Sequence, residues 1–130
     1  VVQRRSAEQE RQFRAQSPQP IRIVISTEDL TTSSQYCSAA GQSRPDFRGT
    51  GGTLTCGADD VLTTTKRTLL TNTIIPAALA RLQAHINVNR FTSNLVTSGS
   101  CSDMTVPASH SSTGVANADY VLYVAAGPIS

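Results

Sequence analysis

Residues 21–30 read IRIVISTEDL, and the folded part of the chain is expected to begin with them. Ile21 to Ile25 form a β-branched run of the kind found in mostly buried strands. Ser26 to Leu30 follow with side chains that cap helices and form turns. The segment therefore predicts a strand over 21–26 that ends in a turn.

The segment before this strand is polar. Residues 1–20 read VVQRRSAEQERQFRAQSPQP and contain one large apolar residue, Phe13, after the two leading valines. This composition predicts an exposed N-terminal arm over 1–20, with a brief helix around residues 6–14 that stops at the prolines.

The net charge of +2 is concentrated in the first 22 residues, which hold five Arg and two Glu. The rest of the chain holds six basic and seven acidic side chains. A folded part this close to neutral cannot neutralise several phosphates, so no nucleic-acid partner is expected. The 130 residues suit one domain, and no apolar run reaches the roughly 18 residues that a membrane span needs.

Residues 31–57 are rich in glycine and are interrupted by Pro45, which predicts a loop without regular elements. The three cysteines, Cys37, Cys56 and Cys101, lie in Gly/Ser/Thr-rich surroundings, which favours disulfides and an oxidising compartment. A Cys37–Cys56 disulfide would tie the long loop down. It would leave Cys101 either free or paired with a cysteine on another chain or in a missing stretch of this one.

Residues 59–87 are predicted to form one long helix, opened by Asp59 and Asp60, whose charges suit the positive end of the helix dipole. Its apolar side chains recur at steps of three, four and seven residues and should share one face. Pro76 lacks a backbone donor, so a kink or break is expected just before it. The side chains expected to face a sheet are Leu62, Leu69, Ile74, Leu82 and Ile86.

Two further strands are expected after the helix. Residues 91–97 (FTSNLVT) predict a moderate strand, and residues 120–126 (YVLYVAA) predict an apolar strand in the middle of a sheet. The order strand, helix, strand indicates a β-α-β unit with a right-handed crossover.

The chain offers no set of side chains from which a catalytic or metal site could be built. His85 and His110 lack ligand-spaced partners and are best interpreted as structural histidines. The pairs Glu28–Asp29 and Asp59–Asp60 suit helix starts better than acid–base catalysis. The segment Gly49–Thr53 (GTGGT) lacks the lysine of a phosphate-binding loop.

A series of landmarks in a fixed order resembles the leishmanolysin family, the zinc metalloproteases of trypanosomatid cell surfaces. The resemblance starts with residues 21–30 and covers roughly residues 21–126, and the arm before it carries none. The later landmarks are Cys37, Thr55-Cys56, Asp60-Val61-Leu62, Lys66-Arg67, Leu69, Ile75-Pro76, Cys101, Val106-Pro107 with His110, Gly114, and the run from Asn117 to Ala125.

The resemblance implies an α+β, metzincin-like zincin fold. Residues 21–130 would be the N-terminal portion of its catalytic module, with a twisted, mostly parallel sheet and one long Pro-kinked helix, incomplete in this chain. In this family a His-Glu-x-x-His helix and a third histidine bind Zn²⁺. None of these is present here, so the resemblance implies Zn²⁺ in the parent enzyme, held by residues outside this chain, and no catalytic, cofactor-binding or metal residue within it.

The same resemblance implies that the parent protein is a zinc metalloendopeptidase that hydrolyses peptide bonds in proteins. The partners would be the remainder of the same polypeptide and protein or peptide substrates, and Cys101 would pair with a cysteine outside this chain. The location would be the cell surface or secreted, with a lipid anchor in the missing C-terminal part left open. Two other interpretations are a non-catalytic cell-surface adhesion or binding module of the same fold, and a small secreted binding domain.

Overall fold

The computed structural model describes residues 6–15, 17–49, 51–99 and 103–128. The chain divides into two compact units. The first comprises Val1–Val24, Ala77–Gly99 and Pro107–Leu122, and the second comprises Ile25–Pro76, Ser100–Val106 and Tyr123–Ser130.

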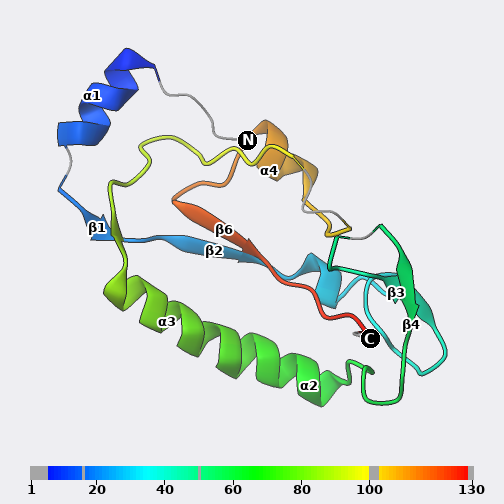
Figure 1. Cartoon of the computed structure of the whole chain (residues 1–130). Helices are drawn as coiled ribbons and strands as arrows, with labels where there is room; N and C mark the ends of the chain where they lie inside the picture. Colours follow the sequence, from blue (N-terminus) through cyan, green and yellow to red (C-terminus); the bar gives the residue numbers. More distant parts are fainter. Residues whose placement is uncertain (1–5, 16, 50, 100–102, 129–130) are drawn as a thin grey trace. The chain divides into compact units, whose positions relative to one another are not determined.

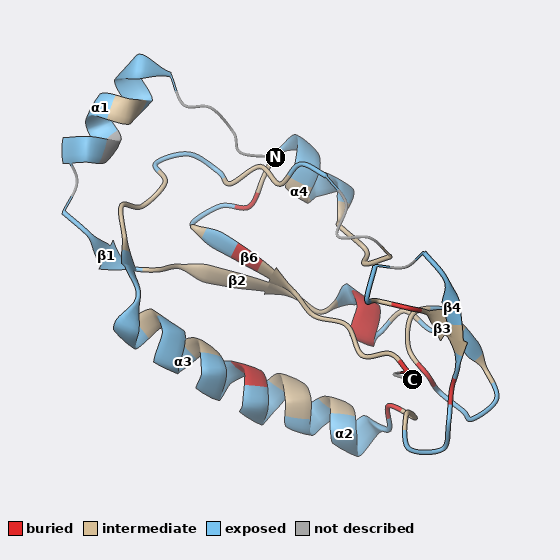
Figure 2. Cartoon of the chain, in the orientation of Figure 1, coloured by how far each residue is buried: buried red, intermediate tan, exposed pale blue. Residues whose placement is uncertain are grey.

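Helix α1 spans Ala7–Ala15 in the arm and begins with a capping box. The backbone N–H of Ser6 donates to Oε1 of Gln9 at 2.9 Å, and the N–H of Gln9 donates to Oγ of Ser6 at 3.3 Å. Most of α1 is exposed (Figure 2). At the end of the arm, β1 (Gln19–Pro20) pairs antiparallel with β5 (Asn87–Val88), and both residues of β1 are exposed.

Strands β2 (Ile23–Ser26) and β6 (Tyr120–Tyr123) lie side by side (Figure 1). The N–H of Tyr120 donates to the carbonyl of Arg22 at 3.2 Å, and that of Val124 donates to Ser26 at 2.9 Å. The residue numbers increase in the same direction on both strands, from 22 to 26 and from 120 to 124, so the two strands are parallel. Val121 is buried while Tyr120 is 51% exposed, so the described part of the chain does not bury both faces of β6.

The predicted helix starts later than Asp59. It consists of α2 (Thr64–Leu69), a π-helical turn η2 (Leu70–Ile74) and α3 (Ile75–His85). The hydroxyl of Thr63 accepts the N–H of Lys66 at 3.2 Å and caps α2. Asp60 instead accepts the N–H of Gly57 at 2.8 Å and so holds the preceding loop.

The buried face of this helix also differs from the prediction. Ile75 is 7% exposed. Together with the half-buried residues at positions 67, 71 and 79, it forms a stripe with a step of four residues. The π turn just before Pro76 is wider than an α turn, so a stripe traced with a 3.6-residue period drifts off the true face. Of the side chains expected to face a sheet, only Leu62 is buried, and the exposed ones are Leu69, Ile74, Leu82 and Ile86.

The expected loop over residues 31–57 contains a hairpin. Strand β3 (Ser43–Pro45) pairs antiparallel with β4 (Thr53–Thr55). Gly49 and Gly51 interrupt regular structure, but they also allow the chain to turn back on itself. Both have positive φ, 85° and 70°, and they supply the chain reversal that joins the two strands.

The strand expected over residues 91–97 is wrong. Within this stretch only Leu95 pairs, as an isolated antiparallel bridge to Val115. The backbone of Phe91 is bonded to side chains instead of to a neighbouring strand. Helix α4 (Ala108–Ser112), which the sequence did not predict, starts after Pro107.

Few side chains are buried (Figure 2). In the second unit, Leu30 and Asp29 at the end of the 3₁₀ turn η1 (Glu28–Leu30) are 0% and 2% exposed. The buried apolar residues of the described chain are Leu30, Cys37, Cys56, Leu62, Ile75, Val115, Ala118 and Val121.

Candidate functional site

The most densely bonded group in the first unit joins Arg22, Phe91 and Asp119, and is called the Arg22–Asp119 clasp below. Oδ1 of Asp119 accepts Nη2 of Arg22 at 2.7 Å and the N–H of Phe91 at 2.9 Å. Oδ2 accepts Nε and the backbone N–H of Arg22, each at 2.9 Å. Nη2 of Arg22 also donates to the carbonyl of Phe91 at 2.8 Å.

The clasp is an ion pair removed from water, since the Asp119 side chain is 3% exposed and that of Arg22 is 24% exposed. Burial raises the pKa of Asp119, but the hydrogen bonds from Arg22 and Phe91 and the charge of Arg22 outweigh it, so the pKa is lowered. The hydrogen bond to Asp119 raises the pKa of Arg22. Both groups stay charged at neutral pH and hold structure together.

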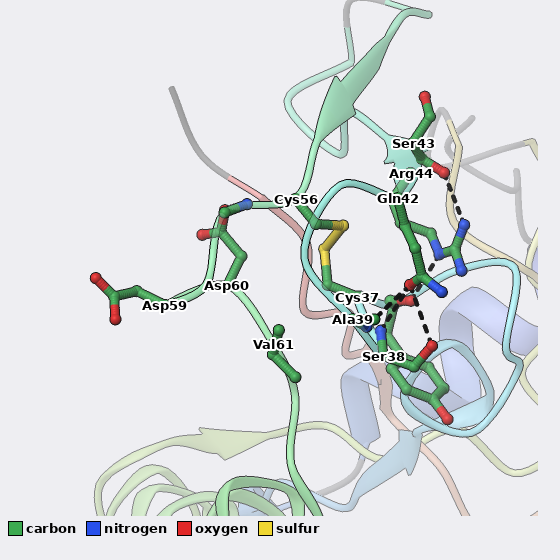
Figure 3. Close-up of a disulfide and its surroundings, with 12 residues drawn as sticks. Cys37, Ser38, Ala39, Gln42, Ser43, Arg44, Cys56, Asp59, Asp60 and Val61 are labelled. Atoms are coloured by element: carbon green, nitrogen blue, oxygen red, sulfur yellow. Dashed lines mark hydrogen bonds between the residues drawn. A yellow bond between two sulfur atoms is a disulfide. The ribbon is translucent and has the colours of Figure 1, made fainter.

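The disulfide in the second unit joins Cys37 and Cys56, whose Cα atoms lie 5.9 Å apart. Both residues are buried, at 0% and 3% exposure. Figure 3 shows Gln42 beside the disulfide, with its Oε1 accepting the N–H and hydroxyl of Ser38 and the N–H of Ala39. The disulfide and Gln42 therefore fix the loop ahead of the β3–β4 hairpin. Cys101, for which a partner outside the chain is implied, lies outside the described residues.

Asp29 and Gln35 in the second unit meet at Thr105. Oδ2 of Asp29 accepts the N–H of Thr105 at 2.9 Å, and Nε2 of Gln35 donates to its hydroxyl at 3.3 Å. Oδ1 of Asp29 and Oε1 of Gln35 are buried and have no donor. Glu28, which precedes Asp29 in the chain, is exposed, and its side chain makes no hydrogen bond to this group among the described residues.

Arg67 on α2 stacks on Tyr36, with its guanidinium carbon 4.6 Å from the ring centroid. The backbone of Tyr36 is also held, because Nε of Arg44 donates to its carbonyl at 2.7 Å. The pair is a cation–π contact beside the disulfide.

The histidines and the remaining acids do not converge on a reaction centre in the described residues. Nδ1 of His85 donates to the carbonyl of Arg81 at 2.7 Å at the end of α3. The backbone of His110 in α4 accepts the N–H of Thr97 at 2.9 Å. Within residues 6–15, 17–49, 51–99 and 103–128, no group of three His, Cys, Asp or Glu side chains could hold a metal ion.

Sequence reasoning missed the clasp. The signal was present, since Arg22 interrupts an otherwise apolar run, and a charge in such a run is rarely buried unless it is paired. Its partner could not be read from the pattern, because Asp119 lies 97 positions away.

Comparison with known proteins identifies the kind of chain that carries these features. The sequence model of the family described as leishmanolysin matches residues 2–130. Leishmanolysin of Leishmania chagasi is 38% identical over 112 residues, which is 83% of this chain and 18% of that protein. Leishmanolysin of Leishmania major is 36% identical over the same length, and a leishmanolysin homolog of Crithidia fasciculata is 35% identical over 119 residues.

The chain thus spans about a fifth of the length of these curated relatives, 17–18% in the three named. The family match covers nearly all of the chain, including the arm that the landmarks had left out. Arg22, Cys37, Cys56, Arg67 and Asp119 all lie within the matched region. On this match, the chain belongs to the leishmanolysin family.

Proposed function

We propose that this chain is the N-terminal part of the catalytic module of a zinc metalloendopeptidase, which hydrolyses peptide bonds in proteins. The observation that carries the proposal is the family match over residues 2–130, together with relatives of which this chain spans 17–18%. The parent polypeptide supplies the remainder of the module, and proteins or peptides are its substrates.

The described residues do not fit a zinc site, so the proposal assigns Zn²⁺ to residues outside this chain. Zinc in proteins takes three or four Cys, His, Asp or Glu ligands. No such group exists among the described side chains, and His85 uses Nδ1 to bond the carbonyl of Arg81. The chemistry that the metal supplies therefore involves no side chain described here.

The contribution of this chain is structural: a parallel strand pair and a long helix that stand behind the substrate cleft of the parent enzyme. Strand β6 has β2 as its partner within the described residues, which leaves its other edge available for a strand of the remaining polypeptide. Further strands added there would complete a twisted, mostly parallel sheet, with the helix interrupted ahead of Pro76 beside it.

The proposed location is the cell surface or the secreted space. Support comes from the buried disulfide between Cys37 and Cys56, since structural disulfides persist in oxidising compartments. In the described part of the chain, no helix combines the length and apolar character needed to cross a bilayer. A lipid anchor would belong to the C-terminal part of the parent protein.

The test compares the intact parent protein with residues 1–130 alone. The parent should contain about one zinc per molecule by elemental mass spectrometry and should cleave casein, and a chelator should abolish this cleavage. Residues 1–130 should bind no stoichiometric zinc, should not cleave casein and should be poorly soluble.

Three results contradict the proposal. A folded parent without zinc and without peptidase activity would favour a cell-surface adhesion module of the same fold. Zinc-dependent cleavage by residues 1–130 alone would show that the metal ligands lie in this chain after all. A soluble, cooperatively melting 1–130 would favour an independent binding domain.

A further inference from the structure

The Arg67 guanidinium is held in place, and none of the residues that the structure describes supplies a counter-charge to it. It lies against the Tyr36 ring at 4.6 Å, and Tyr36 precedes the disulfide-bonded Cys37. Nε of Arg44 donates a 2.7 Å hydrogen bond to the carbonyl of Tyr36. The backbone N–H of Arg67 is bonded to Thr63 in the first turn of α2. Both the ring and the cation are thus anchored by the fold.

The hydrogen-bonding capacity of this guanidinium is unused. Nε is buried and has no acceptor. The two terminal nitrogens are not among the buried unpaired atoms, and the side chain makes no hydrogen bond or ion pair with the described residues. Half-buried arginines are usually paired, because their five N–H donors form a fork that suits a carboxylate.

Among the described residues, no acidic side chain is the partner of Arg67. All nine acidic residues lie within the described ranges, and none pairs with Arg67. The neighbouring cations are already engaged: Lys66 donates to the carbonyls of Asp59 and Val61, and Arg44 donates to Tyr36 and Ser43. The nearest acid in sequence with a known role, Asp60, is bonded to Gly57.

We propose that Arg67, stacked on Tyr36, binds the carboxylate of an Asp or Glu side chain in the remainder of the parent polypeptide. The chain spans 17–18% of its relatives, so most of the parent lies outside it, and the uncompensated positive charge selects an acidic group there. A guanidinium pre-oriented on an aromatic ring loses little freedom on forming a two-pronged bond to a carboxylate. This inference rests on the proposed function, in that it takes the chain to be one part of a larger module.

The test uses the intact parent protein with Arg67→Gln, Arg67→Lys and, as a matched control, Arg81→Gln. Arg81 lies on α3 and is exposed, and its side chain makes no hydrogen bond or ion pair with the described residues. The half-life of thermal unfolding, followed by circular dichroism at a fixed temperature, is measured between about pH 3.5 and 7. At pH 7, Arg67→Gln should shorten the half-life about 5- to 30-fold, Arg67→Lys by less, and Arg81→Gln hardly at all.

The pH profile separates an ion pair from simple stacking. A carboxylate bound to Arg67 has a lowered pKa in the folded protein. The longer half-life of the wild type relative to Arg67→Gln should therefore be fully present above the pKa of that carboxyl in the unfolded protein, about 4. That advantage should shrink as the pH falls through the folded value. An advantage that stays constant over the range would show that only the Tyr36 contact is lost, and would overturn the proposal. So would equal effects of Arg67→Gln and Arg81→Gln.

A second arm separates a polypeptide carboxylate from a free anion. The half-lives are compared in sodium phosphate and in sodium chloride of equal ionic strength. The wild-type advantage should be the same in both salts, and an advantage that appears only with phosphate would overturn the proposal in favour of a small-anion site. Zinc content and casein cleavage of the unsubstituted parent are measured separately, so failure of this inference is distinguishable from failure of the proposed function.

Discussion

Replacement of Asp119 by alanine removes the acceptor that holds the Arg22–Asp119 clasp together. Four donors lose an acceptor: Nε, Nη2 and the backbone N–H of Arg22, and the backbone N–H of Phe91. The guanidinium of Arg22 keeps one hydrogen bond, to the carbonyl of Phe91. A cation 24% exposed is then left without its counter-charge.

The cost is set by the burial of this pair. Removing one partner of a buried ion pair typically costs about 3–5 kcal/mol, because the other charge stays desolvated and unpaired. At 1.36 kcal/mol for each factor of ten, this is between about a hundredfold and a few thousandfold in an opening equilibrium. Glu10 and Arg14 form an exposed ion pair that serves as the control, with side chains 43% and 78% exposed. Glu10→Ala should therefore change the opening free energy by no more than about 0.5 kcal/mol.

Native-state hydrogen exchange by mass spectrometry on the intact parent protein measures this locally, without assuming that the whole protein unfolds in one step. Asp119→Ala should accelerate exchange in peptides that contain the N–H groups of Arg22 and Phe91, while Glu10→Ala should leave them unchanged. Asp119→Asn, which retains one acceptor oxygen, should give an intermediate acceleration. Exchange at these two amides that stays within threefold of wild type in Asp119→Ala would refute the reasoning that the carboxylate protects them.

Three further outcomes are expected in the intact parent. The pKa of Asp119 is lowered in the fold, so the protection it confers should be full above about pH 5 and be lost as the pH falls below about 4 through the folded value, after correction for intrinsic exchange rates. Ile75→Ala should cost about 2–5 kcal/mol and Leu82→Ala about 0.5, since their exposures are 7% and 42%; equal costs in denaturant unfolding would show that the rest of the protein covers Leu82. Gly114 and Gly41 both have positive φ, but a Cβ meets atoms at 3.0 Å only at Gly114, so Gly114→Ala should lower the melting temperature more than Gly41→Ala.

The apolar runs were the informative part of the sequence. Residues 21–26 and 120–126 read as strands because β-branched and aromatic residues cluster there, and the structure has β2 and β6 inside these ranges. Residues 91–97 have a similar composition but form no strand ladder. The side chains of Arg22 and Asp119 bond the backbone of Phe91, where a neighbouring strand would otherwise pair. Such long-range side-chain bonds leave no local pattern.

The predictions of where the helix starts and which face it buries were wrong because of local features of the chain. Asp59 and Asp60 have the composition of a first turn, but Asp60 is used by Gly57 and Thr63 provides the cap. The π turn over Leu70–Ile74 inserts a wider step that no 3.6-residue template contains. The Cys37–Cys56 disulfide could be predicted because a long Gly-rich loop needs anchoring, whereas the clasp and the Arg67–Tyr36 contact could be recognised only in the fold.

The separation of the clasp residues along the chain fixes when this part of the protein can assemble during synthesis. Translation adds about 5–20 residues per second, so the codon of Asp119 is read roughly 5–20 s after that of Arg22, 97 positions earlier. Cys37 and Cys56 are only 19 positions apart and are both made within about 1–4 s of each other. The hairpin can therefore close early, while a growing chain carries the Arg22 cation in an unpaired apolar strand until its carboxylate emerges.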